Sequence, residues 1–370
     1  MKAPERCFAI VAGGGTAGHV LPGIAVAKAL TGRGHAVHYV GAERGVEARL
    51  VPEAGLPLTL LPGRGIKRSL SLDNLGAIAG IVRAFARAVA LVRRLRPAVV
   101  VAMGGFASVP CALAAVLWRV PIVVAEQNAV PGAANRLTAR FAKACAVSFP
   151  GTPLPRAVVT GNPVRPEVSA IDRARDGEAA KAALGVGSGR TMVLVFGGSL
   201  GALKLNVATI GLVERWKDRA DLHVRHVVGA RDWDAISAQA PALPPGGLEH
   251  VLVCYEDDMP LALTAADVAV SRAGSSTCFE LAAAALPAVV VPSPFVTGDH
   301  QSANARNLAE AGAAVVVPDA DLDAARLARE LDGLLSDPAR RAATSAAVHR
   351  LARPDADDAI ADLAENHANA

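Results

Sequence analysis

The stretch AIVAGGGTAGHVLPGIAVAKAL, residues 9–30, decides the fold. It joins a short apolar run to a helical pattern through a glycine cluster, in which Gly13, Gly15 and Gly18 are spaced as G-x-G-x-x-G. Glycines in a strand-to-helix turn let the backbone approach a ligand closely, and the helix N-terminus favours a phosphate group. The alternative is a tight turn that binds nothing. His19 directly follows the last glycine, and a turn that binds a dinucleotide has no use for so large a side chain there.

Short apolar runs alternate with helical patterns along the whole chain, which predicts right-handed βαβ units and parallel sheets. The strands are expected at 8–12, 36–41, 58–62, 98–104, 121–126 and 144–149, and later at 191–196, 222–229, 248–255, 267–274, 287–294 and 313–318. A Pro- and Gly-rich segment, GNPVRPEV (161–168), interrupts the pattern and predicts a linker. We therefore expect two Rossmann-like domains, residues 1–163 and 164–346, with a C-terminal helix at about 347–370 that packs back on the first. A ligand site is expected in the cleft between them, beyond the carboxyl ends of the strands.

Composition narrows the class of protein. The 370 residues are 52% hydrophobic and 19% charged, which suits a large core and argues against disorder. Five widely spaced cysteines without a CxxC pair argue for a reducing compartment, against a disulfide framework and against a zinc site. No secretory signal or membrane-spanning stretch is evident. The net charge of +4 suits an anionic ligand or membrane surface and does not by itself indicate nucleic acid.

Three further glycine turns have the same arrangement as the first: MGGFASVP (103–110), FGGSLGA (196–202) and SRAGSSTCFE (271–280). Four turns at the carboxyl ends of strands, divided between two domains, predict two phosphate-bearing ligands. A dinucleotide-dependent dehydrogenase is an alternative, because Glu43 lies at the distance expected of a ribose-binding acid. That alternative leaves His19 and the turns of the second domain without a role.

Several motifs, in this order, resemble the MurG family of bacterial glycosyltransferases (glycosyltransferase family 28). They are GGGTAGHVLPGIAVAKAL, MGGFASVP, EQNAVPGAANR (126–136), TGNPVR (160–165), FGGSLGA, SRAGSSTCFELAAAALP and DHQSANA (299–305). The resemblance covers nearly the whole chain. It implies a GT-B fold and inverting transfer of N-acetylglucosamine from UDP-N-acetylglucosamine to lipid I, the undecaprenyl-pyrophosphoryl-linked muramyl pentapeptide, which gives lipid II. A non-catalytic nucleotide-sugar-binding protein is a further alternative.

The resemblance also implies the site residues. Those expected to bind UDP-N-acetylglucosamine are Thr16, Ala17, Gly18, Asn128, Arg165, Ser199, Glu256, Ser275, Ser276, Thr277, Cys278, Phe279, Glu280 and Gln301. Those expected at the acceptor diphosphate are Gly14, Gly15, Gly104 and Gly105. This chain departs from many relatives at Ala125, Leu200 and Phe106, and Glu256 stands where uracil is met through the backbone.

The transfer needs a base for the acceptor hydroxyl and positive groups for the departing diphosphate. His19 is the expected base, since an unperturbed histidine is largely neutral near pH 7; it could instead only order the turn. Glu126 is the second candidate for the base. Asp319 and Asp321 form a D-x-D pair, but PDADLDAARLARE is typical of an acidic helix start, so neither a metal nor a cofactor is expected.

A lipid acceptor calls for a membrane-facing surface, and residues 63–97 offer one. Ile78, Ile81, Val82, Phe85 and Val89 share one helical face, with cations from Lys67, Arg68, Arg83, Arg87, Arg93 and Arg94; Trp118 and Arg119 extend the patch. The alternative is a stripe packed on the sheet. We expect a peripheral protein on the cytoplasmic face of the bacterial inner membrane, in cell-wall biogenesis, cell shape and division, with a cell-wall synthesis complex as a possible partner and no nucleic acid.

Overall fold

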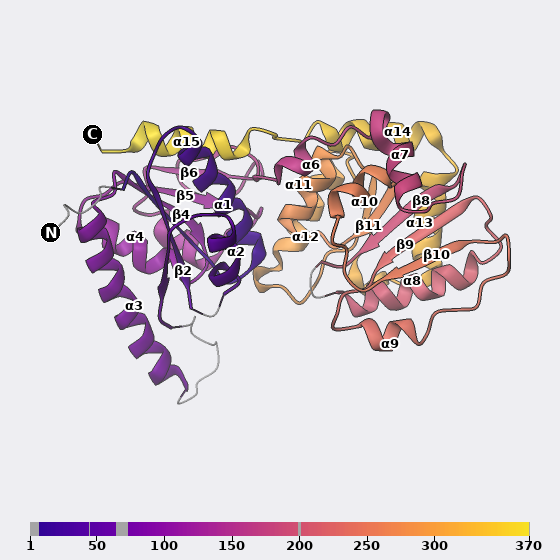
Figure 1. Ribbon diagram of the computed structural model, residues 1–370, viewed down its shortest axis with the longest axis horizontal. Coiled ribbons are helices and arrows are strands. Elements are labelled where there is room, and N and C mark those ends of the chain that lie inside the picture. The colour runs from indigo at the N-terminus through magenta and orange to yellow at the C-terminus, as the bar shows by residue number, and fades with distance from the viewer. Residues whose placement is uncertain (1–6, 44, 64–72, 199–200, 370) are drawn as a thin grey trace. The chain divides into compact units, whose positions relative to one another are not determined.

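The chain forms two compact units in the computed structural model, which describes residues 7–43, 45–63, 73–198 and 201–369. Unit 1 comprises residues 1–165 and 353–370, and unit 2 comprises residues 166–352. Each unit is a parallel sheet with helices on its faces (Figure 1). The prediction of two Rossmann-like α/β domains is confirmed.

Within the described residues, the sheet of unit 1 has the strand order β3-β2-β1-β4-β5-β6-β7, with every pair parallel. The strands are β1 (Ala9–Gly13), β2 (Val37–Ala42), β3 (Leu58–Leu61), β4 (Val99–Gly104), β5 (Ile122–Glu126), β6 (Ala144–Val147) and β7 (Ala157–Val159). The helices are α1 (Ala17–Gly32), α2 (Glu47–Glu53), α3 (Asp73–Leu95), α4 (Ser108–Leu117), α5 (Ala133–Thr138) and α15 (Ala356–His367). The central strands β1 and β4 are buried along their whole length, as their unbroken apolar sequences predict. Strand β7 was not expected, because it is a three-residue edge strand whose side chains are all exposed.

Helix α1 has no polar stripe, and its neighbours explain why. Val20, Ala27 and Leu30 are fully buried in the cluster that covers one face of the sheet. Ile360 and Ala364 of α15 belong to the same cluster, so α1 has the sheet on one side and α15 on another. Arg33, at the end of α1, donates to the carboxylates of Asp358 (2.7 Å), Asp362 (2.6 Å) and Glu365 (2.8 Å) on α15. The last helix of the chain is therefore part of the core of unit 1.

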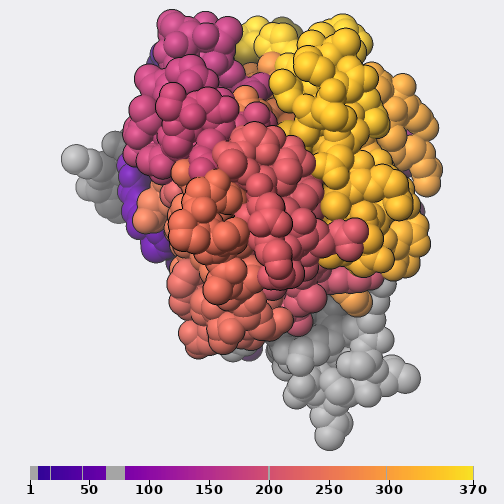
Figure 2. Space-filling model, turned by 90° about the vertical axis from the view of Figure 1, so that its right-hand side faces the viewer, coloured from indigo at the N-terminus to yellow at the C-terminus, as the bar shows by residue number. Residues whose placement is uncertain are grey.

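Within the described residues, the sheet of unit 2 has the order β10-β9-β8-β11-β12-β13, also parallel throughout. The strands are β8 (Thr191–Phe196), β9 (Leu222–Val227), β10 (Glu249–Val253), β11 (Val268–Ser271), β12 (Ala288–Val290) and β13 (Val315–Val316). The helices are α6 (Pro166–Ser169), α7 (Arg173–Ala183), α8 (Leu203–Arg215), α9 (Trp233–Ser237), α10 (Met259–Ala265), α11 (Ser275–Ala283), η1 (Thr297–Asp299), α12 (His300–Glu310), η2 (Asp319–Asp321), α13 (Ala324–Leu335) and α14 (Pro338–His349). In Figure 2 unit 2 faces the viewer, with the α9–β10 segment in salmon and orange on its near surface. Helices α8 and α13 pack on one face of the sheet through Leu205, Leu212, Leu327 and Leu331, all fully buried.

Burial lowers the pKa of three histidines at the β9–β10 side of unit 2: His223 and His226, which are buried, and His250, which is half-buried. His226 is fully buried, and its Nε2 bonds to Oδ1 of Asn206 on α8 at 3.1 Å. The His226 ring stacks on that of His250, with centroids 5.8 Å apart. Burial lowers the pKa of His226 to about 3 and that of His250 to about 4. Both rings are therefore neutral in the folded protein at pH values where a solvated histidine is charged.

Unit 2 should lose stability on mild acidification. Because the folded pKa values lie below the unfolded value near 6.5, the unfolded chain binds more protons below that pH. The stabilisation is complete above about pH 6.5 and is lost as the pH falls toward the folded pKa values. Each histidine contributes up to roughly 1.4 kcal/mol per pH unit, so the free energy of unfolding should fall by about 1–3 kcal/mol between pH 6.5 and 5.5. Urea titrations followed by circular dichroism measure this change.

Substitution His226→Gln should reduce that pH dependence by about one histidine's share, and His349→Gln at the C-terminal end of α14 is the control variant. An equal pH dependence in the His226→Gln variant would show that another group is responsible.

Candidate active site

The glycine turns after β1 and β4 pack backbone against backbone. Gly13 and Gly104, which end these neighbouring strands, are paired after a one-residue shift in register that follows the Ala12–Ala102 pair. A Cβ atom on Gly105, whose φ is +77°, would collide with the carbonyl oxygen of Gly14. A Cβ on Gly13 would lie 2.6 Å from Cβ of Met103, closer than real side chains approach. Both turns thus need glycine in order to fit together, and not only in order to admit a ligand.

His19 lies directly beside this contact. It is the third residue of α1, and its backbone N–H donates to the carbonyl of the N-cap residue Thr16 at 3.1 Å. The Thr16 side chain makes no N-cap hydrogen bond to a backbone N–H of the helix. Its Oγ1 lies 3.0 Å from Nδ1 of His19 instead. A Cβ on Gly104 would stand 2.9 Å from Cδ2 and 3.2 Å from Nε2 of His19. Gly104 therefore makes room for the imidazole ring, which explains how a histidine fits at the exit of a glycine turn.

Glu126 ends β5 with its side chain buried, 3% exposed. Its Oε1 accepts from the backbone N–H of Asn128 at 3.0 Å and from the Asn128 amide at 3.4 Å. Its Oε2 accepts from the N–H of Gly132 and from Nδ2 of Asn135, both at 2.9 Å. The carboxylate is thus met by four donors and shapes the loop from residue 126 to 135, which carries the predicted sugar-binding residue Asn128.

Asn135 is a residue that the sequence reasoning did not assign. It is 2% exposed, and its amide also donates to the carbonyl of Ala125 at 3.0 Å. Its Nδ2 lies 3.3 Å from the point where a Cβ on Gly104 would stand, so His19 and Asn135 meet over the same glycine. The available signal was its place in EQNAVPGAANR, the same motif as Glu126 and Asn128.

The other expected residues of unit 1 are placed as follows. Ala17 and Gly18 are the first two residues of α1. The N–H of Gly15 donates to the carboxylate of Glu47, at 3.2 Å from Oε1 and 3.1 Å from Oε2. Arg165 is half-buried and is the last residue of unit 1 before the chain enters unit 2.

In unit 2, Gly274 is the N-cap of α11, and the predicted residues Ser275 to Glu280 occupy its first turns. The first N–H groups of a helix have no partner within it, and the helix dipole favours an anion there. The side chains of Cys278 and Phe279 are 2% and 6% exposed, so they face the core. Burial raises the pKa of the Cys278 thiol to about 12, which keeps it protonated. Any contact of these two residues with a ligand is therefore through the backbone.

Gln301 follows an unusual turn at the start of α12. Gly298 and Asp299 both have positive φ, +73° and +52°. The Gln301 Oε1 accepts from the backbone N–H of Ser293 at 2.8 Å, and the side chain is half-buried. The amide oxygen is thus occupied within the protein, and the NH₂ group is the part of Gln301 that a sugar hydroxyl can meet.

Glu256 follows β10 and is buried, with its Oε2 2.6 Å from Nε of Arg225 on β9. Because the Glu256 side chain is engaged in this ion pair, we expect any ligand contact at this position to be through the backbone. Ser199 and Leu200, in the glycine turn before α8, and Lys67 and Arg68 lie outside the described residues.

The carboxylate of Asp319, the first residue of the D-x-D pair, forms ion pairs with Arg272 and Lys204. Its Oδ1 lies 2.6 Å from Nη1 of Arg272, and its Oδ2 lies 3.7 Å from Nζ of Lys204. The cap of α13 is Asp323, which accepts from the N–H of Arg326 at 2.7 Å. In the described part of the chain, no group of three or more His, Cys, Asp or Glu side chains is arranged to hold a metal ion.

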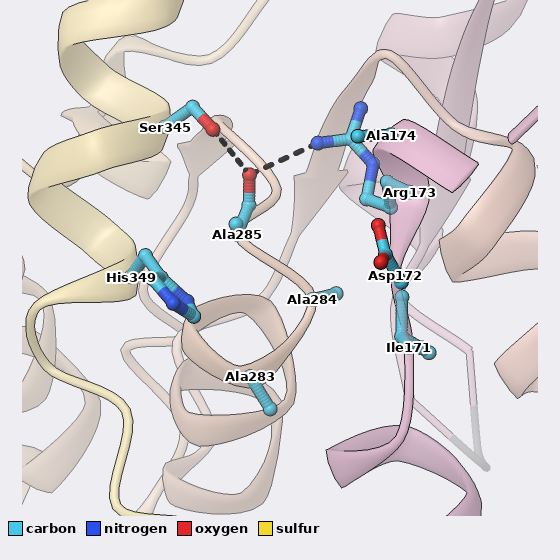
Figure 3. A pocket seen from close by; sticks show the side chains of 9 residues that line it. All are labelled: Ile171, Asp172, Arg173, Ala174, Ala283, Ala284, Ala285, Ser345 and His349. Carbon is cyan, nitrogen blue, oxygen red and sulfur yellow. Dashed lines mark hydrogen bonds between the residues drawn. The ribbon is translucent and has the colours of Figure 1, made fainter. Parts of the chain in front are cut away.

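A cavity of about 540 Å³ lies in unit 2 at the opposite end of α11 from Ser275 (Figure 3). Arg173 and Ser345 reach into this region, and both donate to the carbonyl of Ala285, at 2.9 and 2.7 Å. None of the predicted site residues lines the cavity.

Comparison with known families bears on both units. Residues 9–147 match the glycosyltransferase family 28 N-terminal domain, and residues 192–360 match the family 28 C-terminal domain. The chain belongs to glycosyltransferase family 28. It is therefore a transferase, and the dehydrogenase alternative is wrong. The exposed side chain of Glu43, which that alternative assigned to a ribose, lies 3.5 Å from Arg87.

Relatives of this family 28 chain match along nearly its whole length. A protein of Desulforudis audaxviator is 38% identical over 96% of this chain and 97% of its own, and one of Nocardioides sp. is 41% identical over 96% of each. Both are named UDP-N-acetylglucosamine--N-acetylmuramyl-(pentapeptide) pyrophosphoryl-undecaprenol N-acetylglucosamine transferase. The crystal structure of Acinetobacter baumannii MurG has a TM-score of 0.80 and 28% identity, covering 98% of this chain and 100% of its own. The resemblance to the MurG family and the predicted GT-B fold are confirmed.

Because four hydrogen-bond donors surround the Glu126 carboxylate, we expect that replacing it with a neutral amide destabilises the fold. In Glu126→Gln an NH₂ group must face two of these donors, which leaves buried groups unpaired and should lower the free energy of unfolding by about 1–3 kcal/mol. Urea unfolding measures this, with Glu43→Gln as the exposed control, for which less than about 0.5 kcal/mol is expected. A variant with an unchanged unfolding midpoint and a large loss of turnover would assign the base role to Glu126.

Proposed function

We propose that this protein transfers N-acetylglucosamine from UDP-N-acetylglucosamine to the C4 hydroxyl of the muramyl residue of lipid I, which gives lipid II for peptidoglycan synthesis. The names of the full-length relatives support this substrate pair. One observation of the structure carries the mechanism: the His19 ring rests on Gly104, with Nδ1 bonded to Thr16.

His19 is the general base. When the Nδ1–H group donates to the Thr16 hydroxyl, the ring adopts the tautomer with a basic Nε2. Nε2 takes the proton of the acceptor hydroxyl as that oxygen attacks the anomeric carbon. The bond from this carbon to the UDP oxygen breaks in the same step, so the configuration is inverted. Glu126 shapes the adjoining loop instead, because all four of its hydrogen bonds come from that loop.

The donor is held mainly by unit 2. Ser275 to Glu280, with the N-terminus of α11, meet the diphosphate and ribose, and Arg165 adds positive charge as UDP leaves. The backbone at Glu256 meets uracil, and Ser199 binds the diphosphate. In unit 2 the Gln301 NH₂ group selects the sugar. In unit 1 the residues that the family resemblance implies for the sugar are Asn128, Thr16, Ala17 and Gly18. No metal or cofactor enters this reaction.

Because the acceptor is a lipid, we infer that the protein works at the cytoplasmic face of the inner membrane, in cell-wall growth, shape and division. No helix among the described residues is long and apolar enough to cross a membrane. Helix α3 turns Ala84 and Ala88 into the core and leaves Val82 61% exposed, with Arg83 and Arg87 beside it. Helix α4, which packs on α3, ends at Leu117 and Trp118, 60% and 43% exposed, and the Arg93 guanidinium lies 5.7 Å from the Trp118 ring centre. Exposed apolar groups and cations on two helices that pack together suit an anionic membrane.

The base assignment predicts the kinetics of His19→Ala. Turnover should fall on the order of 10²- to 10⁴-fold, the usual contribution of a positioned base, which equals roughly 3–5 kcal/mol of barrier. The KM for UDP-N-acetylglucosamine should change little, and the acidic limb of the kcat/KM profile should flatten. Assays with a soluble lipid I analogue test this, with His349→Gln as a control. If the His19→Ala variant keeps the acidic limb and loses only a few-fold in turnover, His19 only orders the turn. If the wild-type protein binds the donor but shows no turnover, the protein is a non-catalytic nucleotide-sugar-binding protein.

The membrane assignment predicts a separate effect. Changing Arg83 and Arg87 to Glu should weaken binding to phosphatidylglycerol vesicles at least tenfold, since each cation near the surface contributes about 1 kcal/mol. Activity on a short-chain acceptor should persist. The same charge change at Arg175 and Arg329 of unit 2 is the control. Unaltered vesicle binding in the α3 variant would place the membrane contact elsewhere.

A further inference from the structure

Glu47 is a buried acid that the proposed mechanism does not use. It is the first residue of α2 and is fully buried. Its Oε1 accepts from the N–H of Ala42, at the end of β2, at 2.6 Å, and both carboxylate oxygens lie close to the N–H of Gly15. A single carboxylate thus ties the start of α2 to two strand ends of the sheet.

Three glycines from different segments make room for this side chain. A Cβ atom on Gly14 or on Gly45 would collide with the Glu47 carboxylate, and one on Gly41 would collide with its methylene group. Gly14 belongs to the turn after β1, Gly41 to β2, and Gly45 to the turn before α2. Glycine at these three positions is therefore required for the Glu47 side chain to fit.

The position of the carboxylate bears on what the first glycine turn binds. The N–H groups of such a turn, beside a helix N-terminus, are where anions usually bind. The N–H of Gly15 already donates to the Glu47 carboxylate. This carboxylate lies near the N-terminus of α1, where the helix dipole favours a negative charge. An acceptor diphosphate that approached Gly15 would meet an occupied donor and a like charge.

We infer that Glu47 is a positioning residue for the transfer: it occupies the Gly15 N–H and so holds the first glycine turn in the conformation that presents Thr16 and His19. This inference rests on the proposed role of His19. In consequence the acceptor diphosphate is met by the second turn, at Gly104 and Gly105, and not by Gly14 and Gly15. The first turn has the spacing of a phosphate site, but it serves to place a base.

Glu47→Gln tests the inference, because it keeps the shape of the side chain and sets an NH₂ group against a backbone N–H. We expect kcat to fall about tenfold, the KM for UDP-N-acetylglucosamine to stay within about twofold, and inhibition by inorganic pyrophosphate to be no stronger than in the wild type. Glu53→Gln, at the exposed end of α2, is the matched control. In the His19→Ala background, Glu47→Gln should cause no further loss, because both changes act through the same group.

Gly14→Ala is the second variant. It leaves Glu47 unchanged, but the added methyl group pushes the Glu47 carboxylate away from the Gly15 N–H. It should show the same loss of kcat with an unchanged donor KM, and it serves if Glu47→Gln does not fold. A full tenfold loss from Glu47→Gln in the His19→Ala background would overturn the inference, and so would stronger inhibition by pyrophosphate. If His19→Ala alone loses only a few-fold, the base assignment fails, and that result is visible without any Glu47 variant.

Discussion

The contact between the turns after β1 and β4 is the constraint on which the site of unit 1 depends. Neighbouring parallel strands end at the same edge of a sheet, so the turns that follow them compete for the same space. Here the conflict is resolved by removing side chains: Gly14 and Gly105 touch through backbone atoms, and Gly104 leaves a gap that the His19 ring fills. The position of the imidazole is thus set by the spacing of two strands, which is among the most rigid dimensions of a protein.

Buried polar side chains around this contact act as supports. Glu47 accepts hydrogen bonds from the backbone N–H groups of Ala42 and Gly15, and Glu126 accepts from two backbone N–H groups and two side-chain amides. Each carboxylate thereby fixes the path of the loop that supplies its donors. Unit 2 uses the same device, since Arg272 donates to the carbonyl of Val291 at 3.1 Å and pairs with Asp319. A charge in a low-dielectric interior is stable only with its partners in place, so such groups specify one arrangement strongly.

Much of this architecture could be predicted from the sequence, because unbroken apolar runs of Val, Ile and Ala are typical of strands buried on both faces. The pattern failed at β7, because its apolar run of three residues, AVV, is too short to predict a strand and lies exposed at the edge of the sheet. It proposed His19 as the base and Glu126 as the second candidate, but it gave no information on the hydrogen-bond donors that surround the Glu126 carboxylate. Asn135 and Glu47 were missed for a related reason: their partners are nine and thirty-two residues away, and only the folded sheet brings them together.

The packing of α15 into unit 1 has a consequence for how the protein is made. The chain leaves unit 1 after Arg165 and returns at Arg353, so all of unit 2 is synthesised before α15 exists. At ribosomal speeds this interval is on the order of tens of seconds. During that time the apolar surface of α1 that α15 later covers is exposed, and Arg33 lacks the carboxylates of Asp358, Asp362 and Glu365. The domain that begins first is therefore completed last, and its sheet must wait for the whole of unit 2 to be synthesised before α15 can cover α1.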